Sequence, residues 1–249
     1  MNEDKHELFQ SVTTVFIDLD DTLWDFAANS AVALRRVYDH FAVSRWQPDY
    51  ALFASAYERR NAQLWHDYHH GRVSREFLLA ERFRHALQCA GCLDDCTRLG
   101  ADMNEWYLNC LATLPAAVPG ARELLVALQG AGLPAYVLSN GFAGVQQRKL
   151  ASAGLAGLVS GLILSDDCGI TKPQRGIFDY ALSRTGATAG EVVMVGDDPD
   201  TDILGAHDAG WLTIYFNPKC RPAAPATATA QVTSLLQVPH LLGCAPAEE

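Results

Sequence analysis

The chain has 249 residues, of which 49% are hydrophobic and 19% charged, a composition typical of a folded globular protein rather than a disordered one. Its 29 acidic residues outnumber its 19 Lys and Arg residues, which gives a formal net charge of −10. A surface this acidic repels the phosphate backbone of long DNA or RNA, and this argues against a general nucleic-acid-binding protein. A small phosphorylated metabolite is compatible with the charge if a metal ion and local cations offset the field at its site.

The first ten residues are polar and charged, and no segment reaches the roughly 18 consecutive apolar residues of a membrane span. We therefore expect no secretory signal and no membrane anchor. Seven cysteines at irregular spacing indicate reduced thiols in a cytoplasmic protein. The spacing of Cys89, Cys92 and Cys96 permits zinc binding, but no second Cys or His pair follows at zinc-finger distance.

Residues 13–18 form a short β-branched and aromatic run that ends in an acid, which predicts a buried strand. Between residues 23 and 111 the apolar side chains recur at helical spacing, and no convincing strand interrupts them. This second segment is predicted to be entirely helical.

After residue 120, short apolar strands alternate with helices. The predicted strands are 135–138, 161–164, 191–195 and 211–216, and the predicted helices are 121–129, 144–153, 176–184 and 201–209. Such alternation predicts a doubly wound α/β fold, in which a parallel sheet is covered on both faces. Because the first strand precedes the helical block, we expect a core of residues 1–22 and 112–249 with an inserted helical cap at 23–111. The Pro-, Ala- and Thr-rich segment 219–230 is expected to be a surface loop before a last strand and helix.

Ligands of open α/β sheets bind beyond the carboxyl ends of the strands, so the side chains at those ends define the expected site. Polar and charged residues follow four predicted strands, either directly or, for Lys172, in the loop after the strand 161–164. These residues are Asp18, Asp20, Thr22, Ser139, Asn140, Lys172, Asp197, Asp198 and Asp202. Each of them alone would also suit a turn or a helix cap, and it is their convergence on one edge that favours a functional site.

These residue types meet the needs of phosphoryl transfer. Two carboxylates from separate strands can hold Mg²⁺, which prefers oxygen ligands. An Asp carboxylate can attack phosphorus and form an aspartyl-phosphate, while a second acid protonates the leaving oxygen and later activates water. Ser139 and the backbone N–H groups near Asn140 can hydrogen-bond the phosphoryl oxygens, and Lys172 adds a fixed positive charge.

The four segments resemble, in order, the four motifs of the haloacid dehalogenase-like (HAD) phosphohydrolase superfamily. The matching stretches are DLDDT at 18–22, SN at 139–140, KP at 172–173, and GD with a further Asp at 196–202. The resemblance covers nearly the whole chain, including a helical cap after the first motif. It implies that Asp18 is the nucleophile and Asp20 the general acid/base. It also implies a Mg²⁺ ion bound by the side chains of Asp18 and Asp197 and by the backbone carbonyl of Asp20.

The resemblance gives further expected roles to polar residues around this ion. The residues expected to bind the phosphate or to position the surrounding loops are Thr22, Ser139, Asn140 and Lys172. Lys172 is also expected to steady the nucleophile. A second acid near the metal waters or the lysine is expected at Asp202, and Asp198 is the alternative.

Asp20 favours a phosphatase over a dehalogenase, because a halide leaves without a proton whereas an alkoxide requires one. Outside the four motifs, the chain resembles the pyrimidine-nucleotide 5′-nucleotidase branch of the family. The stretches that carry this likeness are LWDF at 23–26, LWHDYHHG at 64–71, NGF at 140–142, GITKP at 169–173 and DILG at 202–205. The likeness implies hydrolysis of nucleoside 5′-monophosphates, with pyrimidines preferred.

Aromatic residues near the expected rim are candidates for stacking on a base, namely Phe26, Trp65, Tyr68 and Phe142. Trp65 and Tyr68 are three residues apart on a predicted helix, and packing within the cap itself is the favoured alternative for this pair. The main rival function is a phosphatase for another small ester, such as a sugar phosphate or phosphoglycolate. A non-catalytic phosphate-binding regulator is a further rival, although pure binding would not need a positioned nucleophile.

Overall fold

The computed structural model describes residues 7–221 and 225–244, so parts of the N-terminal decapeptide and of segment 219–230 lie outside the described residues. Contacts divide the chain into two compact units. One comprises the chain up to Phe26 and from Pro115 onward, and the other is Ala27–Leu114. The predicted boundaries fell after residues 22 and 111. The first unit extends to Phe26, and within it Trp24 forms an isolated β-bridge with Ala117 on the returning segment.

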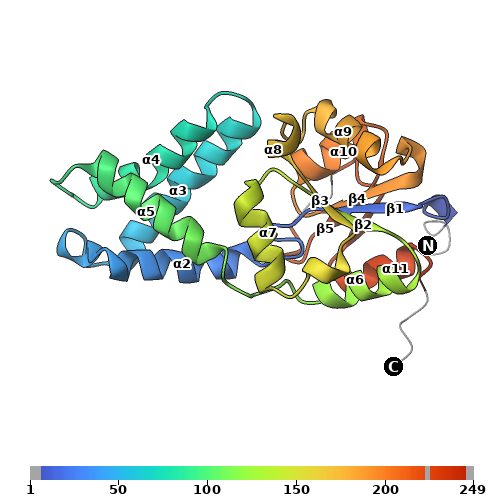
Figure 1. Cartoon of the computed structure of the whole chain (residues 1–249), viewed down its shortest axis with the longest axis horizontal. Coiled ribbons are helices and arrows are strands. Elements are labelled where there is room, and N and C mark those ends of the chain that lie inside the picture. Colours follow the sequence, from blue (N-terminus) through green and yellow to red (C-terminus); the bar gives the residue numbers. More distant parts are fainter. Residues whose placement is uncertain (1–6, 222–224, 245–249) are drawn as a thin grey trace. The chain divides into compact units, whose positions relative to one another are not determined.

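The first unit is built on one parallel sheet (Figure 1). Its described strands are β1 (Thr14–Ile17), β2 (Ala135–Ser139), β3 (Gly161–Leu164), β4 (Val192–Gly196), β5 (Leu212–Phe216) and β6 (Ala230–Val232). They lie in the order β3-β2-β1-β4-β5-β6, and all neighbouring pairs are parallel. This topology confirms the predicted doubly wound α/β core.

Helices cover both faces of the sheet, as its continuous apolar strands require. The helices of this unit are α6 (Ala121–Gly130), α7 (Ala143–Ser152), α8 (Ser165–Cys168), α9 (Arg175–Thr185), α10 (Gly205–Asp208) and α11 (Val238–Leu241), with short 3₁₀ turns at Ala156–Leu158, Ala189–Glu191 and Leu235–Gln237. Figure 1 shows α9 and α10 on one face and α6 and α11 on the other. In the central strand β1, Val15, Phe16 and Ile17 are fully buried. Burying each such side chain stabilises the fold by about 1.5–3 kcal/mol.

The predicted helix 201–209 begins two residues earlier and starts as a π-helical turn, η4 (Pro199–Leu204), which leads into α10. The cause is the cap residue Asp198, whose Oδ1 accepts hydrogen bonds from the backbone N–H groups of Asp200 at 2.9 Å and Thr201 at 2.8 Å. Pro199 occupies the first position, where its missing N–H costs nothing.

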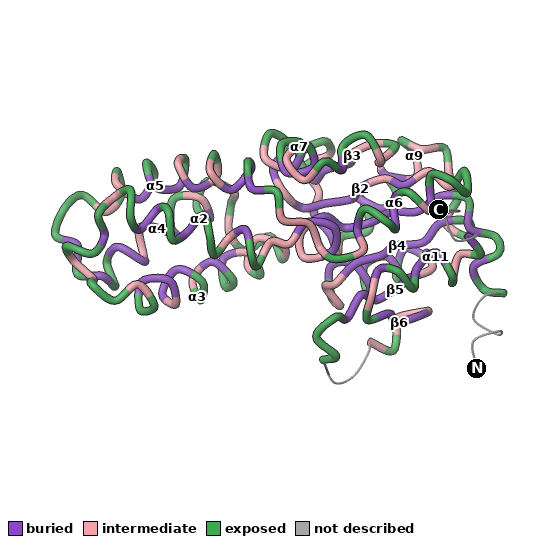
Figure 2. Tube along the Cα trace, turned by 90° about the horizontal axis from the view of Figure 1, so that it is seen from below, coloured by how far each residue is buried: buried purple, intermediate pink, exposed green. Residues whose placement is uncertain are grey.

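The second unit is entirely helical, as predicted. Its helices are α2 (Phe26–His40), α3 (Tyr50–His69), α4 (Arg75–Cys89) and α5 (Cys96–Leu111), with a 3₁₀ turn at Val43–Arg45. Buried and exposed positions alternate along α3 and α5 in Figure 2, as expected for amphipathic helices. Within residues 7–221 and 225–244, none of the helices combines the length and the apolar character needed to span a bilayer.

Three helices of this cap meet at a buried arginine. Arg82 on α4 is 3% exposed, and its guanidinium donates to Asn104 Oδ1 on α5 at 2.7 Å and to Asn61 Oδ1 on α3 at 3.3 Å. The guanidinium carbon also lies 5.3 Å from the ring centroid of Tyr107. The partners of this buried cation are therefore neutral.

The two chain segments that lead into and out of the cap lie side by side within the sheet unit. Trp24 and Ala117 form an antiparallel bridge, and the N–H of Val118 donates to the carbonyl of Leu23 at 3.0 Å. The insertion therefore leaves and rejoins the sheet unit at a single place.

Candidate active site

The strand order places the expected site at the point where the sheet reverses direction. The chain adds β2 and β3 on one side of β1 and then crosses to add β4, β5 and β6 on the other. Ligands of such sheets bind at this switch point, beyond the strand carboxyl ends. Asp18 directly follows β1 and Asp197 directly follows β4, and these strands are parallel neighbours paired through Ile17 and Val195.

A cluster of three carboxylates stands at this switch point. Asp18, Asp197 and Asp202 each contribute an oxygen, and the three oxygens lie within 4.8 Å of one another. Asp202 approaches from η4 and packs directly against Gly196, where any Cβ would collide with its carboxylate. The glycine of the GD pair is thus required by the close approach of Asp202.

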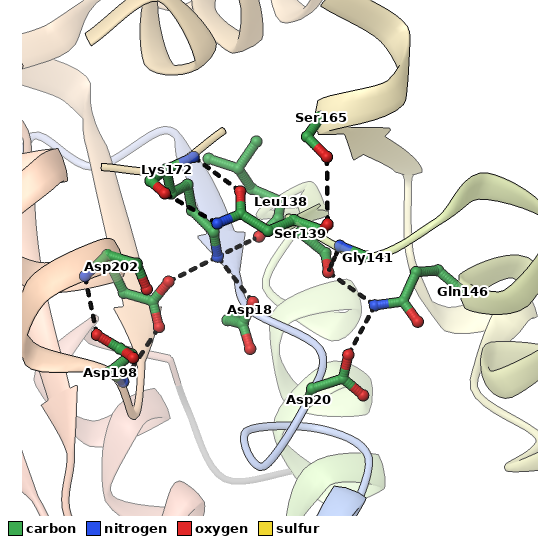
Figure 3. A network of polar contacts seen from close by, with 12 residues as sticks. Asp18, Asp20, Leu138, Ser139, Gly141, Gln146, Ser165, Lys172, Asp198 and Asp202 are labelled. Atoms are coloured by element: carbon green, nitrogen blue, oxygen red, sulfur yellow. Dashed lines mark hydrogen bonds and ion pairs between the residues drawn. The ribbon is translucent and has the colours of Figure 1, made fainter. Parts of the chain in front are cut away.

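Lys172 lies between Asp18 and Asp202 of this cluster (Figure 3) and is 2% exposed. Its Nζ donates to Asp18 Oδ1 at 2.7 Å, to Asp202 Oδ1 at 2.6 Å and to the carbonyl of Leu138 at 2.8 Å. An ammonium has three N–H donors, and these contacts use all of them. The geometry therefore fits the expected role of steadying Asp18. A direct phosphate contact would require one of the three bonds to be exchanged.

The two candidates for the second acid occupy different environments. Asp202 is 1% exposed and binds Lys172, and its Oδ2 also accepts the backbone N–H of Asp198 at 3.2 Å. The carboxylate of Asp198 instead caps η4 through the N–H groups of Asp200 and Thr201. The structure thus places Asp202, and not Asp198, beside the lysine.

Burial and mutual repulsion govern the charges of this cluster. Burial raises the pKa of Asp18 to about 8 despite the opposing effect of Lys172, and burial together with the charges of Asp202 and Asp18 raises the pKa of Asp197 to about 8. Burial alone would lower the pKa of Lys172, but the carboxylates of Asp18 and Asp202 outweigh it and raise that pKa above its ordinary value. Lys172 is therefore a stable cation, whereas the ionised carboxylates lack a sufficient counter-charge.

The donor set of the cluster fits a divalent cation. When ionised, the three carboxylates exceed the single ammonium by two negative charges. Mg²⁺ carries the compensating charge and prefers oxygen ligands. Within residues 7–221 and 225–244, the carboxylates of Asp18, Asp197 and Asp202 lie close enough together to share a metal ion. The cap cysteines Cys89, Cys92 and Cys96 form no such group there.

Asn140 and Ser139, both expected near the phosphate, make different contacts. The Asn140 side chain pairs with the backbone of Lys172, donating to its carbonyl at 2.9 Å and accepting its N–H at 2.7 Å. This amide therefore positions the lysine loop. Ser139 Oγ accepts the N–H of Gly141 at 3.1 Å and an N–H of Gln146 at 2.7 Å. Thr22 is fully buried, and its hydroxyl has no hydrogen-bond partner among the described residues.

The carboxylate of Asp20 is held by two side chains of α7 that motif reasoning does not identify. Lys149 Nζ donates to Asp20 Oδ1 at 2.6 Å, and Gln146 Nε2 donates to Asp20 Oδ2 at 2.8 Å. The available sequence signal is weak. Gln146 and Lys149 are three residues apart on a predicted helix, so they share one face. This spacing does not reveal what that face contacts.

A family model described as haloacid dehalogenase-like hydrolase matches residues 12–210. The chain belongs to the haloacid dehalogenase-like hydrolases. It is 32% identical over 233 residues to the pyrimidine 5′-nucleotidase YjjG of Escherichia coli (strain K12), covering 92% of this chain and 96% of that protein. It is also 30% identical over 228 residues to the ribulose-1,5-bisphosphate 5-phosphatase of Halopiger xanaduensis, covering 89% and 91%.

A solved structure agrees with this assignment. The crystal structure of the HAD-hydrolase YfnB from Bacillus subtilis bound to magnesium superimposes with a TM-score of 0.82 at 28% identity. The match covers 93% of this chain and 98% of that one. The comparisons and the parallel sheet together confirm the family and the fold that the four motifs predict.

The aromatic candidates of this HAD hydrolase differ in how much surface they offer. Phe142 is buried, with 5% exposed, which leaves little of its ring to stack on a base. Phe26 is half-buried, and its ring centroid lies 6.4 Å from that of Trp24. In the cap, Trp65 and Tyr68 contact each other edge to face at a centroid distance of 5.7 Å, which matches the packing alternative for this pair.

Proposed function

We propose that this hydrolase cleaves phosphate monoesters by attack of Asp18 on phosphorus, and that its substrates are nucleoside 5′-monophosphates, with pyrimidines preferred. The observation that carries the proposal is the cluster of Asp18, Asp197 and Asp202 at the switch point, in which Lys172 binds Asp18 and Asp202 and Asp20 lies two residues from the nucleophile. The nearly full-length similarity to a pyrimidine 5′-nucleotidase supports the nucleotide class.

Asp18 is the proposed nucleophile. Lys172 holds its Oδ1, and this contact leaves Oδ2 as the oxygen that forms the bond to phosphorus while the ester P–O bond breaks. Asp20 gives a proton to the departing alcohol oxygen. It then takes a proton from the water that attacks the aspartyl-phosphate, which releases inorganic phosphate and regenerates Asp18.

Magnesium is the proposed cofactor. The side chains of Asp18 and Asp197 and the backbone carbonyl of Asp20 would hold the ion, and Asp202 lies in the same cluster. When bound, the ion offsets the repulsion between the anionic carboxylate and the anionic phosphate. The two excess negative charges of the cluster support a divalent cation over a monovalent one.

A sugar phosphatase is the second candidate, because the chain is similar at 30% identity to an enzyme named for a sugar bisphosphate. The two candidates share all of the chemistry described for Asp18 and Asp20. They differ only in the leaving group. A dehalogenase is disfavoured because it has no need for an acid at position 20.

A substrate panel tests the proposal. Phosphate release with Mg²⁺ would be measured on UMP, dUMP, dTMP, AMP, ribose 5-phosphate and phosphoglycolate, and halide release on a 2-haloacid. We expect the highest kcat/KM on a pyrimidine monophosphate. A higher kcat/KM on a sugar phosphate would show that the proposed substrate class is wrong, while the proposed attack of Asp18 on phosphorus would stand. Nucleotide binding without phosphate release would overturn the enzyme assignment in favour of a regulator.

A further inference from the structure

The geometry points to Gln146 and Lys149 of α7 as positioning residues for Asp20: together they hold its carboxyl group in the orientation used for both proton transfers. This inference rests on the proposed function, since it concerns the proton donor of that reaction. Neither residue belongs to the four motifs.

Two donors on two different oxygens fix a carboxylate that a single contact would leave free to rotate. Lys149 binds Oδ1 of Asp20 at 2.6 Å and Gln146 binds Oδ2 at 2.8 Å, so the plane of the carboxylate is set by α7. The contact with the ammonium is charge-assisted and therefore the stronger of the two. The backbone of Asp20 is held separately, by a β-bridge with Trp24, so the contacts from α7 act on its side chain.

Gln146 links Asp20 to a second predicted site residue. Its Nε2 has two hydrogens, and both have acceptors, namely Asp20 Oδ2 and Ser139 Oγ at 2.7 Å (Figure 3). Gln146 is fully buried, and a Cβ at Gly141 would collide with its amide. The glycine of the SNG segment is thus required for the amide to reach between the acid and the hydroxyl.

Lys149 is fixed as firmly as Gln146. Its side chain is 4% exposed, and its Nζ lies 4.6 Å from the ring centroid of Trp24 and 5.5 Å from that of Phe26. Aromatic faces stabilise a cation at such distances. The side chain of Asp20 is 31% exposed by contrast, so the acid has an accessible side while its supports are buried. This is the arrangement expected for a reactive group and its positioning residues.

The test compares esters with poor and with good leaving groups, because only poor leaving groups depend strongly on a proton donor. The variants are Gln146→Met and Lys149→Met, which keep side-chain length and remove the donors. Gln147→Met is the matched control at an exposed neighbouring position of the same helix. The two esters are the best alkyl phosphate from the substrate panel and p-nitrophenyl phosphate, both with Mg²⁺. Melting temperatures show that each variant is folded.

For the alkyl ester we expect kcat to fall by about 10- to 100-fold in both variants, a part of the roughly 10²–10⁴-fold that general acid–base catalysis contributes. For p-nitrophenyl phosphate we expect a loss below about threefold, since this ester needs little help from an acid. Gln147→Met should match the wild type on both. In an Asp20→Asn background, the two substitutions should add almost nothing on the alkyl ester, because they act through the residue already removed.

Equal losses on both esters, additive losses in the Asp20→Asn background, or no loss at all would overturn the positioning role. These outcomes are distinct from failure of the proposed function. A wild-type protein that releases phosphate from neither ester would overturn that function and this inference with it, whereas an active wild type with insensitive variants overturns the inference alone.

Discussion

Lys172 in the sheet unit and Arg82 in the cap are both buried basic side chains, and their surroundings differ. In the sheet unit, Lys172 is 2% exposed and donates to two carboxylates and a backbone carbonyl. In the cap, Arg82 is 3% exposed and donates to the amide oxygens of Asn61 and Asn104, with one guanidinium nitrogen lacking a partner among the described residues.

The difference shows that a buried charge alone does not mark a reactive site. Arg82 has neutral partners on two other helices, and so it connects α3, α4 and α5 without creating an excess of charge. Lys172 faces the two carboxylates of Asp18 and Asp202, and with Asp197 these form a cluster that could hold a metal ion. Acids whose pKa values are shifted by burial and neighbouring charges, as those of Asp18 and Asp197 are, cluster at functional sites.

The largest loss of activity is expected from Asp18→Asn, which tests whether the acids around Lys172, unlike the neutral partners of Arg82, take part in a reaction. The change removes the oxygen charge that attacks phosphorus but keeps the shape of the side chain, so kcat should fall by at least about 10³-fold with the fold intact. Asp208→Asn, at an exposed aspartate of the same unit, is the control and should leave kcat unchanged. If Asp18→Asn kept more than a few per cent of the wild-type rate, Asp18 would not be the nucleophile.

Removal of magnesium should also abolish turnover, and its binding should be visible without any assay of activity. Saturating Mg²⁺ should raise the melting temperature of the wild type, because a ligand at 100 times its Kd stabilises the folded state by about 2.7 kcal/mol. Asp197→Asn should lose most of this shift. An equal shift in the variant, measured by differential scanning fluorimetry, would place the ion elsewhere.

Lys172→Met tests the charge balance of the cluster by removing its positive charge instead of a negative one. It leaves the carboxylates of Asp18, Asp197 and Asp202 without their buried cation, and kcat should fall by about 10²-fold, as for loss of other preorganised electrostatic groups. The melting temperature without Mg²⁺ should fall, and added Mg²⁺ should recover part of it. Lys219→Met, at an exposed lysine, should change neither quantity.

The smallest effect on turnover is expected in the cap. Arg82→Met leaves the amide oxygens of Asn61 and Asn104 without their donor, which should lower the free energy of unfolding by about 1–3 kcal/mol. At a temperature where the variant is folded, kcat should remain within about twofold of the wild type. Arg98→Met is the exposed control on α5. A large loss of kcat without a loss of stability would give the cap arginine a direct part in the reaction.

Much of the fold and of the carboxylate cluster was predictable because both depend on where strands end. A parallel sheet brings the carboxyl ends of β1 and β4 to one edge, so Asp18 and Asp197 could be placed together despite their separation in sequence. The choice between Asp198 and Asp202 was not predictable. These acids are four residues apart, and the sequence does not say which carboxylate turns back toward the strand; the structure shows that it is Asp202, which packs against Gly196 and binds Lys172.

The supports of Asp20 were missed for a related reason. Gln146 and Lys149 lie 126 and 129 residues after Asp20, and helical spacing says only that they share a face. A buried glutamine and a buried lysine on a short amphipathic helix have no recognisable motif. Their partner becomes apparent only when the turn after β1 and the first turns of α7 are seen side by side.

The bridge between Trp24 and Ala117 has a consequence for how such enzymes diversify. Since the two ends of the inserted segment already meet on the sheet unit, replacing what lies between them adds almost no loop-closure entropy. Another compact insert, grafted between the same two positions, would leave Asp18, Lys172 and Asp197 where they are. The inserted segment can therefore be exchanged in evolution while the carboxylate cluster of the sheet unit is kept.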